Sequence, residues 1–416
     1  MNKITLRSTD QRISGTVNLS GSKSISNRAL LMKNLSGNKI HFGNLSNSDD
    51  TKRLKYYLKF IDVCLSSGVP TTIDTQNAGT VLRFLTAYLA IQDGKWLITG
   101  SKRMLERPVG ELVDALNTLG ATIKYTDKQG YPPLLVKGKE VHGGRISINP
   151  RQSSQFVSAL MMIGPYLKGG IEIVMEKSTV STPYILMTAK LMKLFGIETK
   201  VTAKKITVPT GDYAMSEYNI EPDWSSASYW YQVAALSTNS QIHIPNLTKN
   251  SIQGDAVVAE LFQSLGVETE YNEGGIVIKS KTDSVSKLDF NFKDYPDLVP
   301  TVMATCAAKG VELMIRGINH LKYKESNRIV SMDEELSKFG CSISRQGQAY
   351  LLKPGNLPTQ AEFNTHQDHR IAMSLAPLAL KIKTVSINNP DVSIKSYSDF
   401  WDDMSRMGVF EKSKSQ

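Results

Sequence analysis

Lys23, Ser24 and Arg28 lie close together in GSKSISNRAL (residues 21–30), where an apolar helical run begins. Ser24 or Ser26 is a typical residue for capping the N-terminus of a helix. A helix N-terminus presents free backbone N–H groups and partial positive charge, so it attracts anions. With the added lysine and arginine, this stretch is a candidate cradle for a phosphate or a carboxylate. The alternative is an ordinary capped helix whose charged side chains are solvated.

The same arrangement recurs before several other apolar runs of the chain. The residues at these positions are Gly79 in NAGTVLRFL, Arg107 in ERPVGELVDAL, Ser153, Ser154 and Gln155 in RQSSQFVSAL, Ser181 and Tyr184 in STVSTPYILM, Lys324 and Arg328 in YKESNRIV, Arg370 in QDHRIAM, and Lys395 in SIKSYSDFW. Each motif alone is weak evidence, because plain helix starts look similar. Together the motifs predict a cleft in which several helix N-termini bind a substrate with several anionic groups.

Two carboxylates, Asp297 and Glu325, lie among these cationic motifs. Carboxyl groups act as general acids and bases, and cations around them stabilise developing negative charge. A helix cap is the alternative role for Asp297, because acidic residues are common at that position. The pattern favours acid/base chemistry on a polyanionic substrate.

The composition narrows the classes of partner. The formal net charge is +10, but no run of Lys or Arg is longer than a pair, which favours small anions over nucleic acid. The cysteines Cys64, Cys306 and Cys341 form no CxxC pair, so we expect neither a disulfide nor a metal site, and no cofactor. The N-terminus has no apolar signal region, and no apolar run approaches the ~20 residues of a spanning helix. We therefore expect a cytoplasmic protein without membrane contact.

Four segments of the chain share one pattern, in which a helical run is followed by a glycine and then by an alternating stretch. The glycines Gly120, Gly196, Gly266 and Gly340 are spaced about seventy residues apart. A glycine is favoured just after the C-terminus of a helix. The pattern predicts a repeated α/β unit, and the 416 residues accommodate two domains built from several such units.

In this order, the motifs SKSISNRAL, NAGTVLR, ERPVGELVDAL, SSQFVSAL, KES.R and QDHRIAM resemble those of the 5-enolpyruvylshikimate-3-phosphate synthase family, along essentially the whole chain. The resemblance implies an α/β protein with the two-domain enolpyruvyl transferase fold. Each domain is expected to contain three repeated βαβαββ-type units, with helix N-termini facing the inter-domain cleft. The expected domains are residues 21–222 and a discontinuous second domain, residues 1–20 and 223–416.

The resemblance also implies the reaction. Members of the family transfer the enolpyruvyl group of phosphoenolpyruvate to the 5-hydroxyl of shikimate 3-phosphate by addition–elimination. The products are 5-enolpyruvylshikimate 3-phosphate and phosphate, in the shikimate pathway to chorismate and the aromatic amino acids. Glyphosate is the expected competitor of phosphoenolpyruvate, and we expect a monomer.

The roles known for the family carry over onto matching positions of this chain. Asp297 is the expected base for the 5-hydroxyl, and Glu325 the expected acid at C3 of phosphoenolpyruvate, with Lys23 assisting. Shikimate 3-phosphate is expected to contact Lys23, Ser24, Arg28, Ser153, Ser154, Gln155, Ser181, Tyr184, Asp297, His320 and Lys324. Phosphoenolpyruvate is expected to contact Lys23, Gly79, Arg107, Gln155, Arg328, Arg370 and Lys395. Asp49 and Arg83 are expected to support the site without touching substrate.

Some positions depart from the family pattern. Phe84 follows Arg83 where many members have proline, and Pro222 and Trp224 alter a Gly-Asp-x-Ser-Ser stretch. His320 occupies the position of an asparagine that commonly contacts the shikimate phosphate.

Two alternatives stay open beside this interpretation. A UDP-N-acetylglucosamine enolpyruvyl transferase shares the fold, but it usually carries a catalytic cysteine in the region that corresponds to residues 95–110, which contain none here. A non-catalytic protein that binds phosphate or nucleic acid is the second alternative. The missing runs of Lys and Arg and the lack of aromatic stacking motifs disfavour it.

Overall fold

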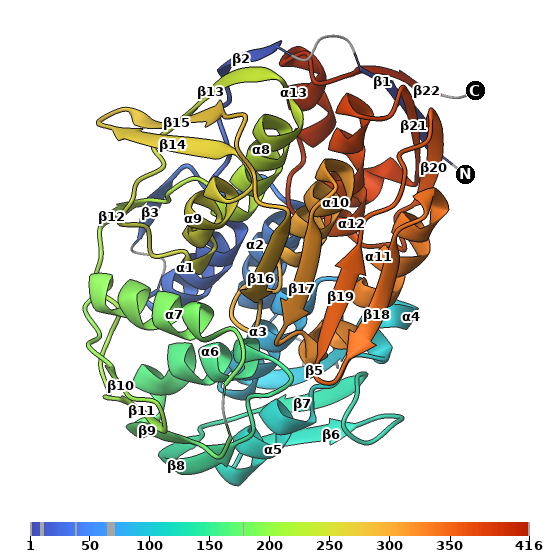
Figure 1. Ribbon diagram of the computed structural model, residues 1–416. Coiled ribbons are helices and arrows are strands. Elements are labelled where there is room, and N and C mark those ends of the chain that lie inside the picture. The colour runs from blue at the N-terminus through green and yellow to red at the C-terminus, as the bar shows by residue number, and fades with distance from the viewer. Residues whose placement is uncertain (1, 9–11, 38–39, 65–70, 178, 415–416) are drawn as a thin grey trace. The chain divides into compact units, whose positions relative to one another are not determined.

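The computed structural model describes residues 2–8, 12–37, 40–64, 71–177 and 179–414, and Figure 1 shows its ribbon. The chain divides into two compact units. Unit 2 is one continuous segment, Lys23–Ile220. Unit 1 combines Met1–Ser22 with Glu221–Gln416, so the N-terminal segment belongs with the C-terminal half.

The described residues form five four-stranded sheets that share one pairing pattern. In spatial order across each sheet, the first two strands are parallel, the second is antiparallel to the third, and the third is antiparallel to the fourth. A parallel pair needs a crossover connection, and a helix lies between the first two strands in each case. This is the repeated helix-and-strand unit that the glycine spacing predicts.

Unit 2 holds two of these sheets. In sheet order they are β4 (Thr71–Asp74), β5 (Gly94–Thr99), β7 (Leu134–Gly138) and β6 (Thr122–Tyr125), and then β8 (His142–Ile148), β9 (Lys168–Met175), β11 (Lys205–Val208) and β10 (Lys200–Val201). The third sheet in the described part of unit 2 has only two strands, β12 (Glu217–Asn219) and β3 (His41–Gly43), which are parallel.

Unit 1 holds three four-stranded sheets. They are β16 (Lys287–Asn291), β17 (Glu312–Arg316), β19 (Ala349–Lys353) and β18 (Ser342–Gln346); β2 (Arg12–Thr16), β13 (Asn239–Pro245), β15 (Gly275–Ser280) and β14 (Val267–Asn272); and β20 (Gln360–Asn364), β21 (Thr384–Asn388), β1 (Lys3–Arg7) and β22 (Glu411–Lys414). The N-terminal strands β1 and β2 complete sheets whose other strands come from the second half of the chain.

The helices of unit 2 are α1 (Lys23–Leu35), α2 (Asp49–Cys64), α3 (Gly79–Ala90), α4 (Lys102–Leu105), α5 (Gly110–Thr118), α6 (Ser154–Ile163), the short 3₁₀ helix η1 (Gly164–Tyr166) and α7 (Thr182–Leu194). The helices of unit 1 are α8 (Trp224–Leu236), η2 (Gly254–Val257), α9 (Val258–Gln263), α10 (Val299–Lys309), η3 (Asn319–Tyr323), α11 (Arg328–Leu336), η4 (Ser337–Phe339), α12 (His369–Leu375), η5 (Ala376–Leu380), η6 (Pro390–Lys395) and α13 (Phe400–Arg406).

The four repeated glycines each follow a helix and precede a strand, as predicted. Gly120, Gly196, Gly266 and Gly340 all have positive φ angles between 78° and 94°. Residues with a side chain rarely adopt this conformation, so glycine lets the chain turn from helix into strand at these points.

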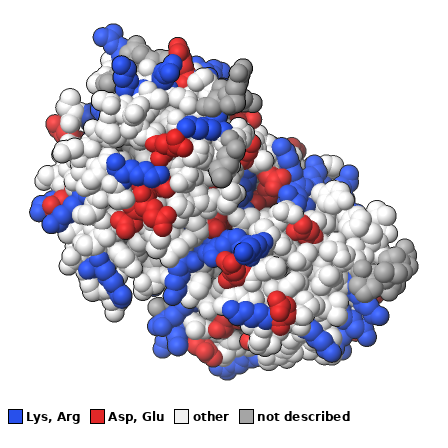
Figure 2. Space-filling view, turned by 90° about the vertical axis from the view of Figure 1, so that its right-hand side faces the viewer, with Lys and Arg blue, Asp and Glu red and all other residues white. Residues whose placement is uncertain are grey.

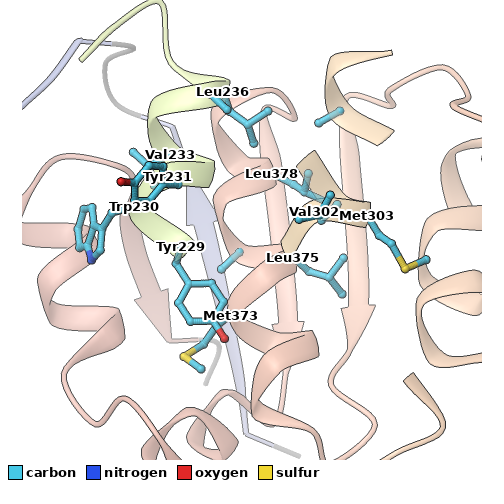
Figure 3. Close-up of a cluster of buried hydrophobic side chains, with 14 of the residues drawn as sticks. Tyr229, Trp230, Tyr231, Val233, Leu236, Val302, Met303, Met373, Leu375 and Leu378 are labelled. Carbon is cyan, nitrogen blue, oxygen red and sulfur yellow. The ribbon is translucent and has the colours of Figure 1, made fainter. Parts of the chain in front are cut away.

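The core of unit 1 centres on α8, where every residue except Ser225 is buried. Figure 3 shows Trp230, Tyr231 and Val233 of this helix in the buried cluster that also contains Val302 of α10 and Leu375 of α12. A helix that is apolar on all sides is stable only when it is surrounded by other elements. The core therefore fixes α8, α10 and α12 together, and with them the residues at their N-terminal ends.

Among the described residues, no helix has the length and apolar character that crossing a membrane requires. Cationic and anionic side chains are interspersed on the face of the molecule that Figure 2 shows.

Candidate active site

Lys23 is the first residue of α1, and its ammonium lies 3.4 Å from the carboxylate of Asp50 in α2. Both side chains are largely buried, so the ion pair fixes Lys23 at the N-terminus of α1, where the helix dipole favours anions. The expectation that Asp49 supports the site was wrong. Asp49 pairs instead with Arg53 at 3.2 Å along α2, and its side chain is 42% exposed. Adjacent residues of a helix point about 100° apart, so only Asp50 can face Lys23.

Arg28 is buried inside unit 2 and connects three helices. Its Nε donates to Thr188 Oγ1 of α7 at 2.7 Å, and its Nη2 donates to Ser158 Oγ of α6 at 3.1 Å. Its Nη1 donates to the carbonyl of Ser24 at 2.9 Å. Burial lowers the pKa of Arg28 to about 10, which still leaves it charged at neutral pH. Most of its donors therefore bond within the protein in this structure.

A second group of unit 2 gathers at the N-terminus of α3. Arg83 donates to Gln155 Oε1 at 2.8 Å, and Gln155 Nε2 donates to Thr80 Oγ1 at 3.1 Å. A Cβ added to Gly79 would lie 2.5 Å from Arg83 Nη1 and 2.8 Å from both terminal nitrogens of Arg107. Two guanidinium groups and a side-chain amide thus meet where the backbone of Gly79 leaves room, an arrangement suited to a carboxylate or phosphate.

The serines of unit 2 lie at helix starts. Ser153 caps α6 by accepting from Gln155 N at 3.2 Å, and Ser154 is the first helical residue. Ser181 precedes α7 with a φ of 57°, and its carbonyl accepts from Tyr184 N at 3.1 Å. The Tyr184 carbonyl in turn accepts from Thr188 Oγ1. These contacts fix the positions of the backbone at both helix starts.

Arg328 is the centre of the group in unit 1. It is the first residue of α11 and is 1% exposed. Its guanidinium donates to Asp297 at 2.8 Å, to Asp368 at 2.9 Å and to Glu325 at 3.2 Å. Asp297 lies just before α10, and Asp368 caps α12 by accepting from Arg370 N. One arginine therefore joins the N-terminal ends of three elements.

Two further cations approach the same carboxylates. Arg370 Nη2 donates to Asp297 Oδ2 at 2.7 Å, and Lys395 Nζ lies 3.8 Å from Glu325. Burial alone would raise the pKa of Asp297, but Arg370, Arg328 and Lys324 outweigh it and hold the pKa well below its ordinary value. Asp297 is therefore a carboxylate ion over the whole neutral range.

His320, in η3, is buried beside this group. Burial and the nearby Lys324 lower its pKa to about 3, so the imidazole is neutral at physiological pH. A neutral imidazole can hydrogen-bond a phosphate but brings no charge to it.

The structure thus joins Asp297, Glu325, Arg328, Arg370 and Lys395 in one ion-pair network, with Lys324 in electrostatic reach. It joins Gly79, Arg107 and Gln155 in a second group, and places Lys23, Ser24 and Arg28 together on α1. Lys395 ends η6 and lies five residues before α13, not directly before it as the sequence suggested.

Sequence reasoning missed two partners of the site, Asp50 and Asp368. Asp50 adjoins Asp49, which the sequence pattern favoured, and Asp368 stands in QDHRIAM near Arg370. The only signal in the sequence is that each lies close to a predicted site residue, and only the helix geometry shows which of two neighbouring residues points inward.

Solved structures share this fold. The chain matches the "2.37 Angstrom Structure of EPSP Synthase from acinetobacter baumannii" with a TM-score of 0.80, at 19% identity and over 100% of both chains. A second solved EPSP synthase from Acinetobacter baumannii matches with a TM-score of 0.77, also at 19% identity over 100% of both chains. The fold is therefore the α/β fold of these synthases.

Sequence comparison gives the family. The model of the EPSP synthase (3-phosphoshikimate 1-carboxyvinyltransferase) family matches residues 8–404. A 3-phosphoshikimate 1-carboxyvinyltransferase of Bacteroides fragilis is 42% identical over 97% of both chains, and one of Vibrio atlanticus is 34% identical over 96% of this chain and 98% of its own. The chain belongs to the EPSP synthase family.

Proposed function

We propose that this protein transfers the enolpyruvyl group of phosphoenolpyruvate to the 5-hydroxyl of shikimate 3-phosphate, with release of phosphate. Family membership supports the reaction. The observation that carries it is the network in unit 1, where Asp297 and Glu325 both bind the buried Arg328 beside Arg370 and Lys395. This places two carboxylates for acid/base work among cations for an anionic substrate.

The two carboxylates have different tasks in this proposal. Glu325 delivers a proton to C3 of phosphoenolpyruvate, while the 5-hydroxyl attacks C2 and passes its proton to Asp297. The tetrahedral ketal phosphate then expels phosphate from C2, which leaves with the C–O bonding pair and takes the proton from Asp297, while C3 returns a proton to Glu325 and the double bond re-forms. Lys23 assists these proton transfers and contacts both substrates.

The hydrogen bonds to Asp297 have a consequence for this scheme. A carboxylate held by Arg328 and Arg370 is a weak base, because its negative charge is already stabilised. Phosphoenolpyruvate carries a carboxylate and a phosphate, and both arginines are proposed to bind it. When the substrate draws these arginines towards its own charges, the basicity of Asp297 rises, so the base is activated only with phosphoenolpyruvate present.

The residues of unit 2 are proposed to bind the anionic groups of both substrates. Gly79, Arg107 and Gln155 accommodate phosphoenolpyruvate, and the clustering of guanidiniums at Gly79 supports this. The helix starts at Ser24, Ser153, Ser154 and Ser181, with Arg28 and Tyr184, are proposed to hold shikimate 3-phosphate, together with His320 and Lys324 of unit 1.

We further propose that glyphosate competes with phosphoenolpyruvate, because it offers a carboxylate and a phosphonate to the same cations. We also propose that the enzyme is monomeric and cytoplasmic, and that it binds no nucleic acid. The lack of long runs of Lys or Arg supports the last point.

Phosphate release from the purified protein tests the function directly. The protein is given phosphoenolpyruvate alone, with shikimate 3-phosphate, or with UDP-N-acetylglucosamine. We expect release only with shikimate 3-phosphate. Release only with the nucleotide sugar would assign the protein to the related transferase, and no release with either acceptor would contradict an enzymatic role.

A further inference from the structure

A chain of hydroxyl groups joins the start of α2 to α1, and the proposed mechanism does not use it. Ser46 Oγ donates to Ser48 Oγ at 3.0 Å, and Ser48 Oγ donates to Thr51 Oγ1 at 3.0 Å. Thr51 Oγ1 in turn donates to Asn27 Oδ1 of α1 at 2.8 Å. All four side chains are buried. A buried polar network whose members are bonded to one another holds them in a defined arrangement.

Backbone groups hold the same chain in place. Ser46 Oγ accepts from Ser48 N at 3.3 Å, and Ser48 Oγ accepts from Thr51 N at 3.4 Å. Ser46 N also donates to Ser26 Oγ at 3.0 Å. Ser26 and Asn27 are adjacent residues of α1, so the segment that leads into α2 is attached to α1 at two successive positions.

The chain and the ion pair between Lys23 and Asp50 join the same two helices. Lys23 and Asn27 are four residues apart in α1 and share one face of it, while Asp50 and Thr51 are adjacent in the first turn of α2. The Lys23 ammonium lies 3.4 Å from Asp50, which is longer than the about 2.7–2.9 Å of a charge-assisted hydrogen bond. The ion pair therefore exerts weak control over the spacing of the two helices, whereas the hydroxyl chain consists of bonds of ordinary length.

We propose that Ser48 and Thr51 are positioning residues for Lys23, because their hydroxyl groups hold the first turn of α2 where Asp50 orients the ammonium without forming a close salt bridge with it. This inference rests on the proposed function, in which Lys23 contacts both substrates and assists proton transfer. If α2 moved towards α1, Asp50 would compete more strongly with the substrate anions for the ammonium. If it moved away, the ammonium would lose an orienting charge. Either displacement lowers the rate, because misplacing a reacting group by about 1 Å can cost about 10²-fold.

The first test compares Thr51→Val, which removes the hydroxyl at similar shape, with Thr51→Ser, which keeps it. Phosphate release at saturating shikimate 3-phosphate gives kcat/KM for phosphoenolpyruvate, at a temperature where circular dichroism shows each protein folded. We expect Thr51→Val to lower kcat/KM about tenfold and Thr51→Ser to stay within about threefold of the wild type.

Thr86→Val is the matched control. Thr86 is a buried threonine of α3 in the same unit, and its Oγ1 donates to the carbonyl of Leu82 at 2.8 Å. The variant loses the same kind of hydroxyl but has no part in the chain between α1 and α2. We expect its kcat/KM to stay within about twofold of the wild type.

A double-mutant cycle separates positioning from a general structural effect. Thr51→Val is measured again in the Asp50→Asn protein, which lacks the carboxylate charge that the chain is proposed to place. If Thr51 acts through Asp50, the loss of about tenfold shrinks to about twofold or less in this background. A general loosening of unit 2 would lower kcat/KM equally in both backgrounds.

The proposal is overturned if folded Thr51→Val keeps kcat/KM within about twofold of the wild type, or if Thr51→Ser loses as much as Thr51→Val. An equal loss in the two backgrounds also overturns it. If Thr51→Val does not fold, Ser48→Ala removes the donor to Thr51, and its loss in the same two backgrounds decides. Failure of the proposed function would appear separately, as absence of phosphate release from the wild type with shikimate 3-phosphate.

Discussion

Arg370 donates a hydrogen bond to Asp297 at 2.7 Å, so the proposed base is paired with a proposed substrate-binding cation. Arg328 holds the other oxygen of the same carboxylate. In the proposed mechanism this arrangement couples substrate binding to base catalysis, because the groups that stabilise Asp297 are the ones proposed to turn towards the substrate.

Asp297→Asn tests the base. We expect kcat for phosphate release to fall by about 10²–10⁴-fold, because the amide cannot take the proton of the 5-hydroxyl. Asp289→Asn is the matched control, since Asp289 forms an exposed ion pair with Arg316 in the same unit, and we expect near wild-type turnover from it. Turnover of Asp297→Asn within tenfold of the wild type would remove Asp297 from the role of base.

Glu325→Gln tests the acid at C3. Glutamine can still accept a hydrogen bond from Arg328, so the network is preserved, but it carries no transferable proton. With both substrates in D₂O, we expect wild-type protein to incorporate deuterium at C3 of phosphoenolpyruvate and the variant to lose this exchange by at least about 10²-fold. Glu198→Gln, at a side chain that is 74% exposed, should exchange normally. Undiminished exchange in Glu325→Gln would assign the proton to another group.

Gly79→Ala tests the binding group at α3. The new methyl group meets the ends of Arg83 and Arg107, so both side chains must move, and Arg83 must leave its position against Gln155. We expect KM for phosphoenolpyruvate and the inhibition constant for glyphosate to rise about tenfold or more, since about 1.4 kcal/mol of lost interaction is sufficient. KM for shikimate 3-phosphate should change much less. Equal glyphosate inhibition of variant and wild type would contradict this placement of the inhibitor.

Arg28→Lys tests whether Arg28 holds unit 2 together. A lysine cannot reproduce the bonds to Thr188, Ser158 and the Ser24 carbonyl, because it lacks the planar fork of donors. We expect the free energy of unfolding, measured with urea, to fall by about 2–4 kcal/mol. Lys52→Arg, at an exposed position of α2, is the control. Unchanged stability with a raised KM for shikimate 3-phosphate would show that Arg28 serves substrate alone.

Glu335→Gln tests a buried carboxylate away from the site. Glu335 binds Lys338 at 2.6 Å, Asn364 N at 2.9 Å and His366 Nε2 at 2.7 Å. Burial opposes ionisation, but these partners outweigh it and lower the pKa of Glu335 below 4.5. A lowered folded-state pKa contributes stability above the unfolded value of about 4.5, and that stability is lost as pH falls through the folded-state pKa.

We therefore expect Glu335→Gln to lower the free energy of unfolding by about 2 kcal/mol at pH 7, and by less at pH 3. Urea denaturation at both pH values measures this. Glu334→Gln, at a side chain that is 59% exposed, should change stability by less than about 0.5 kcal/mol. An equal loss from Glu335→Gln at pH 3 and pH 7 would mean that the charge of Glu335 contributes nothing.

The repeated fold could be predicted because each unit has a local signal. A glycine such as Gly196 marks the end of a helix whatever lies around it, and the structure confirms its positive φ. The helix starts at Gly79 and Ser153 were predicted for the same reason, from polar residues followed by apolar spacing.

The partners inside the site could not be predicted, because they depend on contacts between distant segments. Arg28 reaches Thr188 across 160 positions, and nothing near residue 28 in the sequence indicates this. The sequence pattern favoured Asp49, but Asp50 is the residue that pairs with Lys23 of α1. Two adjacent aspartates have the same chemistry, so the sequence alone does not show which one faces α1.

Because strands β1 and β2 belong to unit 1, the two units are completed at different times during synthesis. Unit 2 is encoded as one uninterrupted stretch, so all of it has left the ribosome while most of unit 1 is still untranslated. Strand β1 has no neighbour until β21 and β22, at the end of the chain, have been made. The residues of β1 must therefore remain unpaired until β21 and β22 have been synthesised, and a nascent chain truncated before Thr384 should present them to a chaperone or protease.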